Sequence, residues 1–154
     1  FARKPFTRRT AFSSYLKLWT RRLGACVAFL GGSITEMNGY RPLVCESLRR
    51  RSPKTAFTFI NAGISSTCST TGAFRLDTDV LVHGPVDLRF VEFAVNDDQD
   101  AHHTREACIR GMEGIIRHAQ QANPDLDVVM TFFVNEGMLH TLQQGGSSIR
   151  RQRS

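Results

Sequence analysis

The sequence lacks the features of a membrane span, a secretion signal and a thiol-based metal site. No apolar run approaches the ~20 residues that a transmembrane helix needs. The first 25 residues are basic but contain no apolar segment of the kind found in signal peptides, so we expect none. The cysteines form no Cys-x-x-Cys pair and have no regular histidine spacing, which argues against a zinc site and a disulfide framework. They are Cys26, Cys45, Cys68 and Cys108.

Two glycine-rich nucleotide-binding patterns are also absent. A phosphate-binding loop needs Gly-x-x-x-x-Gly-Lys, and no lysine follows the glycines at 31 and 32. The dinucleotide fingerprint Gly-x-Gly-x-x-Gly does not occur either. We therefore expect neither a P-loop nor a dinucleotide site.

Acidic residues are missing from both ends of the chain. Residues 1–22 and 145–154 hold half of the 20 basic residues and no acidic one, so residues 23–144 carry a net charge of −4 although the whole chain carries +6. A nucleic-acid surface requires basic residues clustered on the folded body, so this pattern argues against a nucleic-acid partner. We expect residues 1–22 to be a basic leader with a short helix at 15–23, and residues 145–154 to be a disordered basic tail.

At 154 residues the chain is long enough to form one domain that buries roughly 70% of its unfolded surface, and we place that domain at residues 23–144. β-branched and aromatic runs alternate with helical periodicity, which predicts a parallel sheet with helices on both faces: a three-layer α/β/α sandwich of flavodoxin-like kind. The predicted strands are residues 27–30, 57–62, 88–95 and 127–134. The predicted helices are residues 42–51, 73–81 and 104–121, the last with Thr104 as its N-cap.

The third predicted strand carries two charged residues, Arg89 and Glu92. Charges are awkward in a strand that is covered on both faces. We therefore expect one of the two to be paired or to lie near a strand end.

Small and polar residues follow the first three predicted strands. Gly31 and Gly32 precede Ser33, and glycine allows a tight reversal where the strand leaves the sheet. Gly63 follows the second strand and Asn96 the third. Parallel strands have their carboxyl ends at one edge of the sheet, where open α/β folds bind ligands. We therefore expect Ser33, Gly63 and Asn96 to surround one small pocket.

Three blocks of sequence resemble those of the SGNH (GDSL-type) hydrolases, in the family's order and over roughly residues 27–100. They are Val-Ala-Phe-Leu-Gly-Gly-Ser-Ile-Thr, Phe-Ile-Asn-Ala-Gly-Ile-Ser and Val-Glu-Phe-Ala-Val-Asn-Asp. The resemblance implies the SGNH fold, with Ser33 as nucleophile and the N–H of Gly63 and the side chain of Asn96 as oxyanion donors. In the third block Ala94 replaces the family's usual glycine. The implied reaction is cleavage of a small-molecule ester, an acyl or acetyl ester of carbohydrate or lipid, without metal or organic cofactor.

The family's catalytic base is a histidine in a late Asp-x-x-His block, and this chain has no matching block in that place. His103 and His102 follow the third block directly, and His140 has glycine rather than aspartate three residues before it. Loss of one triad member typically lowers the rate by about 10⁴- to 10⁶-fold. We therefore expect the chain to represent the N-terminal two-thirds of a hydrolase domain, altered or cut short after about residue 142, with weak or no activity.

Simpler interpretations of the same residues stay open. Ser33 could be a helix cap, Gly63 a turn glycine, and Asn96 part of a turn. The acidic residues at 97, 98 and 100 could be solvated loop carboxylates or could hold a hard cation. A second hypothesis for function is thus a non-catalytic flavodoxin-like module that binds an anion or small ligand at the same loops.

Overall fold

The computed structural model describes residues 23–134 and 136–144. The expected leader, its helix at 15–23 and the expected basic tail fall outside these residues. Four parallel strands form one sheet in the order β2-β1-β3-β4. The strands are β1 (Gly24–Gly31), β2 (Ala56–Gly63), β3 (Leu88–Glu92) and β4 (Asp127–Met130).

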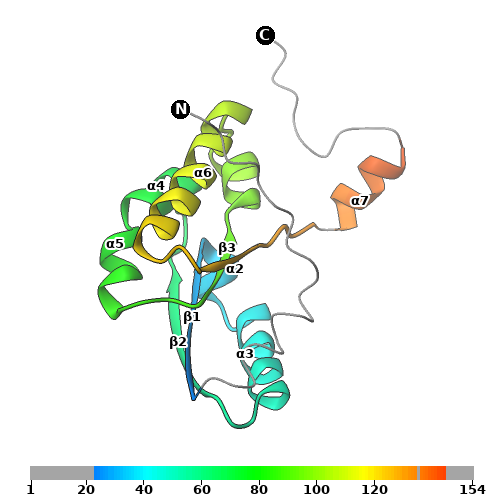
Figure 1. Ribbon diagram of the computed structural model, residues 1–154. Helices are drawn as coiled ribbons and strands as arrows, with labels where there is room; N and C mark the ends of the chain where they lie inside the picture. The colour runs from blue at the N-terminus through cyan, green and yellow to red at the C-terminus, as the bar shows by residue number, and fades with distance from the viewer. Residues whose placement is uncertain (1–22, 135, 145–154) are drawn as a thin grey trace.

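Helices cover both faces of this sheet, which confirms the predicted three-layer α/β/α architecture (Figure 1). On one side lie α4 (Ser69–Phe74), α5 (Leu76–Asp79) and α6 (Arg105–Ala122). On the other lies α3 (Tyr40–Arg51), and α7 (Glu136–Gln143) projects away from the sheet. None of the described helices is both long and apolar enough to cross a bilayer.

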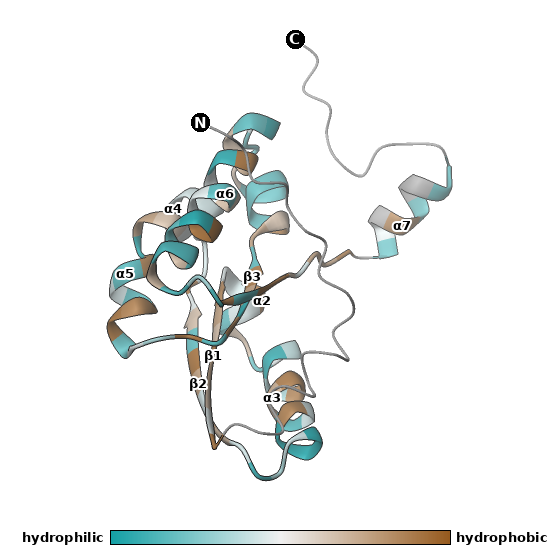
Figure 2. Cartoon of the chain, in the orientation of Figure 1, coloured by the Kyte–Doolittle hydropathy of each residue, from teal (hydrophilic) through white to brown (hydrophobic). Residues whose placement is uncertain are grey.

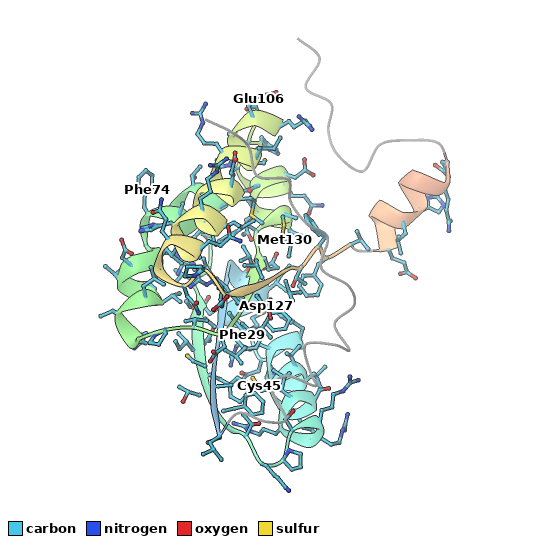
Figure 3. The ribbon with its side chains drawn as sticks, in the orientation of Figure 1. Phe29, Cys45, Phe74, Glu106, Asp127 and Met130 are labelled. Atoms are coloured by element: carbon cyan, nitrogen blue, oxygen red, sulfur yellow. The ribbon has the colours of Figure 1, made fainter. Side chains whose placement is uncertain are left out.

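β1 lies inside the sheet, between β2 and β3, and its side chains enter the cores on both faces; its residues are mostly apolar (Figure 2). Ala28 and Leu30 pack into the core beneath α6. Val27 and Phe29 point to the opposite core, which α3 covers. Phe29 stacks on Phe90 with ring centroids 4.9 Å apart. Figure 3 shows Phe29 and Cys45 in the layer between the sheet and α3.

The predicted helix at 73–81 differs from the structure in its start and its continuity. α4 already begins at Ser69, because the carboxylate of Asp97 accepts the Ser69 N–H at 2.8 Å and satisfies one free donor of the first turn. The helix breaks at Arg75 and continues as α5 and then as a 3₁₀ turn, η1 (Leu81–His83). The helix predicted at 104–121 is confirmed as α6, with Thr104 accepting the Ala107 N–H.

The last two strands are shorter than predicted. β3 stops at Glu92, and the chain then turns through a helical segment into the π-helical turn η2 (Asn96–Asp100). This early stop places Glu92 at a strand end, as expected of one of the two charged residues. Arg89 lies inside β3 and is fully buried. The α7 helix follows the shortened β4 and is not anticipated by the sequence pattern.

Candidate active site

The ends of β1, β2 and β3 meet at one edge of the sheet, as the strand directions require. In the ladder Gly31 pairs with Gly63 on one side and with Glu92 on the other. Directly after Gly32 the chain turns into the short helix α2 (Ser33–Glu36), which places half-buried Ser33 at this edge. The three predicted site loops therefore do come together.

Asn96 packs against the turn that carries Ser33. The side chain of Asn96 is 2% exposed and lies so close to Gly32 that a Cβ there would stand 2.7 Å from the Asn96 Cγ. Only glycine at position 32 allows this approach. Asn96 Nδ2 donates to Asp100 Oδ2 at 2.8 Å, and Asn96 Oδ1 is buried without a hydrogen-bond partner in residues 23–134 and 136–144. The structure therefore brings Ser33 and Asn96 to one spot.

Gly63 lies at the same edge, against the other side of α2. A Cβ on Gly63 would meet the backbone of Thr35 and Glu36, with 2.7 Å to the Glu36 Cα. The Gly63 N–H donates to Asn61 Oδ1 at 3.1 Å, and the Asn61 side chain is exposed. An oxygen of a bound ligand would have to replace Asn61 Oδ1 to accept from this N–H.

The three candidate base histidines lie elsewhere in the contact network. His103 Nδ1 is 3.4 Å from Asp97 Oδ1. His102 Nδ1 lies 3.0 Å from the Asp98 carbonyl oxygen, and His140 Nε2 lies 3.4 Å from the Gln144 amide. Within residues 23–134 and 136–144, no hydrogen bond joins any of them to Ser33.

Arg75 is a residue of this edge that sequence reasoning missed. Its guanidinium donates to the carbonyl oxygens of Gly31 at 2.9 Å and Ala62 at 2.8 Å, and it pairs with Asp79 at 2.7 Å. The pairing with Arg75 lowers the pKa of Asp79. Arg75 thereby ties the ends of β1 and β2 together from the start of α5. In the sequence it is one arginine in a helical stretch, and nothing distinguishes it from a solvated side chain.

Glu92 lies buried beneath the Ser33 turn. Its Oε2 accepts from Thr35 Oγ1 at 3.2 Å, and Thr35 Oγ1 also lies 3.1 Å from the Tyr40 hydroxyl. The Glu92 carbonyl oxygen accepts the Gly32 N–H at 3.3 Å. Burial raises the pKa of the Glu92 carboxyl, although the hydrogen bond from Thr35 acts in the opposite direction. The support that Glu92 gives to the turn therefore depends on the protonation state of its carboxyl, and so on pH.

Replacing Glu92 with glutamine is expected to remove a pH-dependent loss of stability. A carboxyl whose pKa is raised in the folded state stabilises the fold fully below its unfolded pKa, near 4.5, and this contribution is lost as the pH rises through the folded pKa. Urea unfolding of the wild type and Glu92→Gln from pH 4.5 to 8 should give curves that diverge, with the variant relatively more stable at the higher pH. Parallel curves would contradict this assignment.

Comparison with known proteins identifies the fold. The GDSL-like Lipase/Acylhydrolase family matches residues 29–153. A two-domain esterase active on acetylated mannans is 30% identical, with a TM-score of 0.66 over 77% of this chain and 32% of its own. The acetyl xylan esterase AlAXEase is 25% identical, with a TM-score of 0.57 over 68% of this chain and 56% of its own. AlinE4, an SGNH-hydrolase family esterase, shares the fold at 19% identity and a TM-score of 0.63, over 83% and 66%.

The chain spans about a third of the length of the mannan-active esterase. No curated protein matches its sequence significantly. The family match nevertheless covers most of the chain and includes all three loops at the sheet edge. The chain belongs to the GDSL-like lipase/acylhydrolase family and has the α/β fold of the SGNH hydrolases.

Proposed function

We propose that the sheet edge around Ser33 is an ester-cleaving site, with Ser33 as the nucleophile. Attack by the Ser33 hydroxyl on an ester carbonyl produces a tetrahedral intermediate with a negative oxygen. Preorganised donors aimed at that oxygen contribute roughly 3–4 kcal/mol each. The observation that carries the proposal is the packing of the Asn96 amide on Gly32, one residue before Ser33.

The oxyanion donors in this proposal are the N–H of Gly63 and the side-chain amide of Asn96. One side-chain N–H of Asn96 donates to Asp100. The amide nitrogen carries a second N–H, which can donate to the oxyanion. The Gly63 N–H is bound to Asn61 Oδ1, but the exposed Asn61 side chain can turn outward and let the substrate oxygen take its place. The N–H of Ser33 itself would be a third donor.

Acetyl esters on a polysaccharide are the substrate class we propose. The 30% identical relative is active on acetylated mannans, and the 25% identical one is an acetyl xylan esterase. Turnover by this chain should be slow, because none of the described candidate histidines is hydrogen-bonded to Ser33 and a serine hydroxyl needs a base to accept its proton.

Replacing Ser33 with alanine tests the reaction directly. We expect the 154-residue chain to release acetate slowly from p-nitrophenyl acetate and acetylated mannan, and Ser33→Ala to reduce the rate to the uncatalysed background. Ser47→Ala, on α3 away from the sheet edge, is the matched control and should keep the wild-type rate. A fluorophosphonate probe should label the wild type and the control only. Equal turnover by Ser33→Ala would refute the proposal.

The second candidate is a non-catalytic module that holds a small ligand at the same loops. It is favoured by one observation, that none of the described candidate base histidines is hydrogen-bonded to Ser33. Ligand binding that survives Ser33→Ala, combined with no labelling by the fluorophosphonate, would select this candidate.

A further inference from the structure

Three side chains of the types that bind zinc lie together next to Asn96. The ligand atoms of Cys68, Asp97 and His103 are all within 4.8 Å of one another. They come from three separate segments: the residue before α4, the turn η2 and the loop before α6. Cys68 is far in the sequence from Asp97 and His103, so the three residues form no short sequence motif.

The distance between His103 and Asp97 suits a shared metal ion better than a direct contact. His103 Nδ1 and Asp97 Oδ1 are 3.4 Å apart, which is longer than a good hydrogen bond. Zinc binds histidine nitrogen and carboxylate oxygen at about 2.0–2.2 Å, so two such ligands in a tetrahedron lie about 3.3 Å apart. The two atoms therefore already stand at the separation that one zinc ion would require.

The polar atoms of the cluster have few hydrogen-bond partners among the described residues. His103 Nδ1 is buried and has no hydrogen-bond partner within the described part of the chain. Asp97 is 3% exposed, and among the described residues its carboxylate meets the Ser69 N–H and His103 but no lysine or arginine. The Cys68 thiol has only a weak contact, 3.8 Å to the Asn96 carbonyl oxygen. A buried carboxylate without a full positive partner favours a cation at this place.

The surroundings of Cys68 do not favour a free thiolate. Burial raises the pKa of the Cys68 thiol, and the neighbouring carboxylates of Asp97 and Asp100 raise it further. This electrostatic environment disfavours Cys68 as an independent nucleophile. A bound divalent cation reverses it, because a thiol that coordinates a metal gives up its proton.

We propose that Cys68 Sγ, a carboxylate oxygen of Asp97 and a ring nitrogen of His103 bind one Zn²⁺ ion, with water in the fourth position. Binding converts the Cys68 thiol to a thiolate, and the proton passes to solvent. The ion joins the loop that follows β2 to the turn η2 that carries Asn96. It would thus fix two of the three loops at the sheet edge, whether or not Ser33 cleaves esters.

Cobalt titration tests the site without any activity assay. The 154-residue chain, reduced with a phosphine and stripped with a chelator, should bind one Co²⁺ with a thiolate-to-cobalt band in the near ultraviolet. Zn²⁺ should displace the cobalt and abolish that band. Cys68→Ser and His103→Gln should each lose the band and weaken metal binding by more than the roughly 10- to 100-fold that loss of a residue hydrogen-bonded to a ligand costs.

Two neighbouring substitutions serve as matched controls. Cys26→Ser removes a thiol on β1, and His102→Gln removes the adjacent, exposed imidazole, so both should retain the band and the affinity. Circular dichroism confirms that each variant is folded. If Cys68→Ser fails to fold, His103→Gln decides, because the side chain of His103 is partly exposed and tolerates replacement. Absence of the band in the folded wild type, or its persistence in His103→Gln, would overturn the proposal.

Discussion

Gly63→Ala is expected to lower the free energy of unfolding by about 3 kcal/mol or more. The new Cβ would stand 2.7 Å from both the Glu36 Cα and the Thr35 carbonyl carbon, well inside van der Waals contact. These are backbone atoms of α2, so no side-chain rotation can relieve the overlap. Overpacking of this kind typically costs 1–3 kcal/mol and more where the backbone must move. Urea denaturation followed by circular dichroism measures the change.

A second glycine provides the control with the opposite sign. Gly114 lies inside α6, and a Cβ there would meet only the Ala73 Cβ at an ordinary 3.6 Å. Gly114→Ala should therefore be neutral or stabilise by up to about 1 kcal/mol through helix propensity. Equal stabilities of Gly63→Ala and the wild type would show that α2 does not rest on the Gly63 backbone.

Arg89→Met is expected to raise the free energy of unfolding by about 2–4 kcal/mol. The Arg89 side chain is fully buried, and its three guanidinium nitrogens have no hydrogen-bond partner among the described residues. Burial lowers its pKa to about 10, so it remains charged at neutral pH. Replacing buried charges with apolar groups of similar volume is often stabilising by 1–4 kcal/mol, and here no partner would be left uncompensated.

Within residues 23–134 and 136–144, no carboxylate forms a salt bridge with Arg89. Residues 1–22, 135 and 145–154 contain no aspartate or glutamate. Arg117→Met is the control, because Arg117 is exposed and pairs with Glu113, and its loss should change stability by at most about 0.5 kcal/mol. A less stable Arg89→Met would mean that the guanidinium has a partner in the cavity of about 260 Å³ that it lines with Leu81 and Leu126.

The secondary structure was predictable where hydrophobic pattern and local capping agree. The uncharged run before Gly31 identifies β1, and Thr104 with the apolar stripe behind it identifies α6. The predicted element bounds were wrong where a residue distant in the sequence, or the path of the chain after a strand, sets the end of the element. α4 starts early because Asp97 accepts a hydrogen bond at its first turn. β3 ends early because the chain winds into η2 after Glu92.

Of the candidate site, only the location could be predicted, because it follows from the direction of the strands. Parallel topology alone brings Ser33, Gly63 and Asn96 to one edge of the sheet. It cannot specify which side chains meet there, because those contacts cross between loops. The bond from Gly63 to Asn61 and the grouping of Cys68 with His103 are of this kind. The sequence pattern argued against a zinc site for the same reason, since it reads spacing along the chain rather than proximity in space.

Arg75 connects the carboxyl ends of β1 and β2 at the edge of the sheet. One guanidinium binds carbonyl groups at the ends of two neighbouring strands, those of Gly31 and Ala62, and its own position depends on the junction between α4 and α5. A shift of that junction would therefore be transmitted to both strand ends at once rather than absorbed by one flexible loop. Amide exchange at residues 31–33 and 62–64 should accordingly rise together when this anchor is removed.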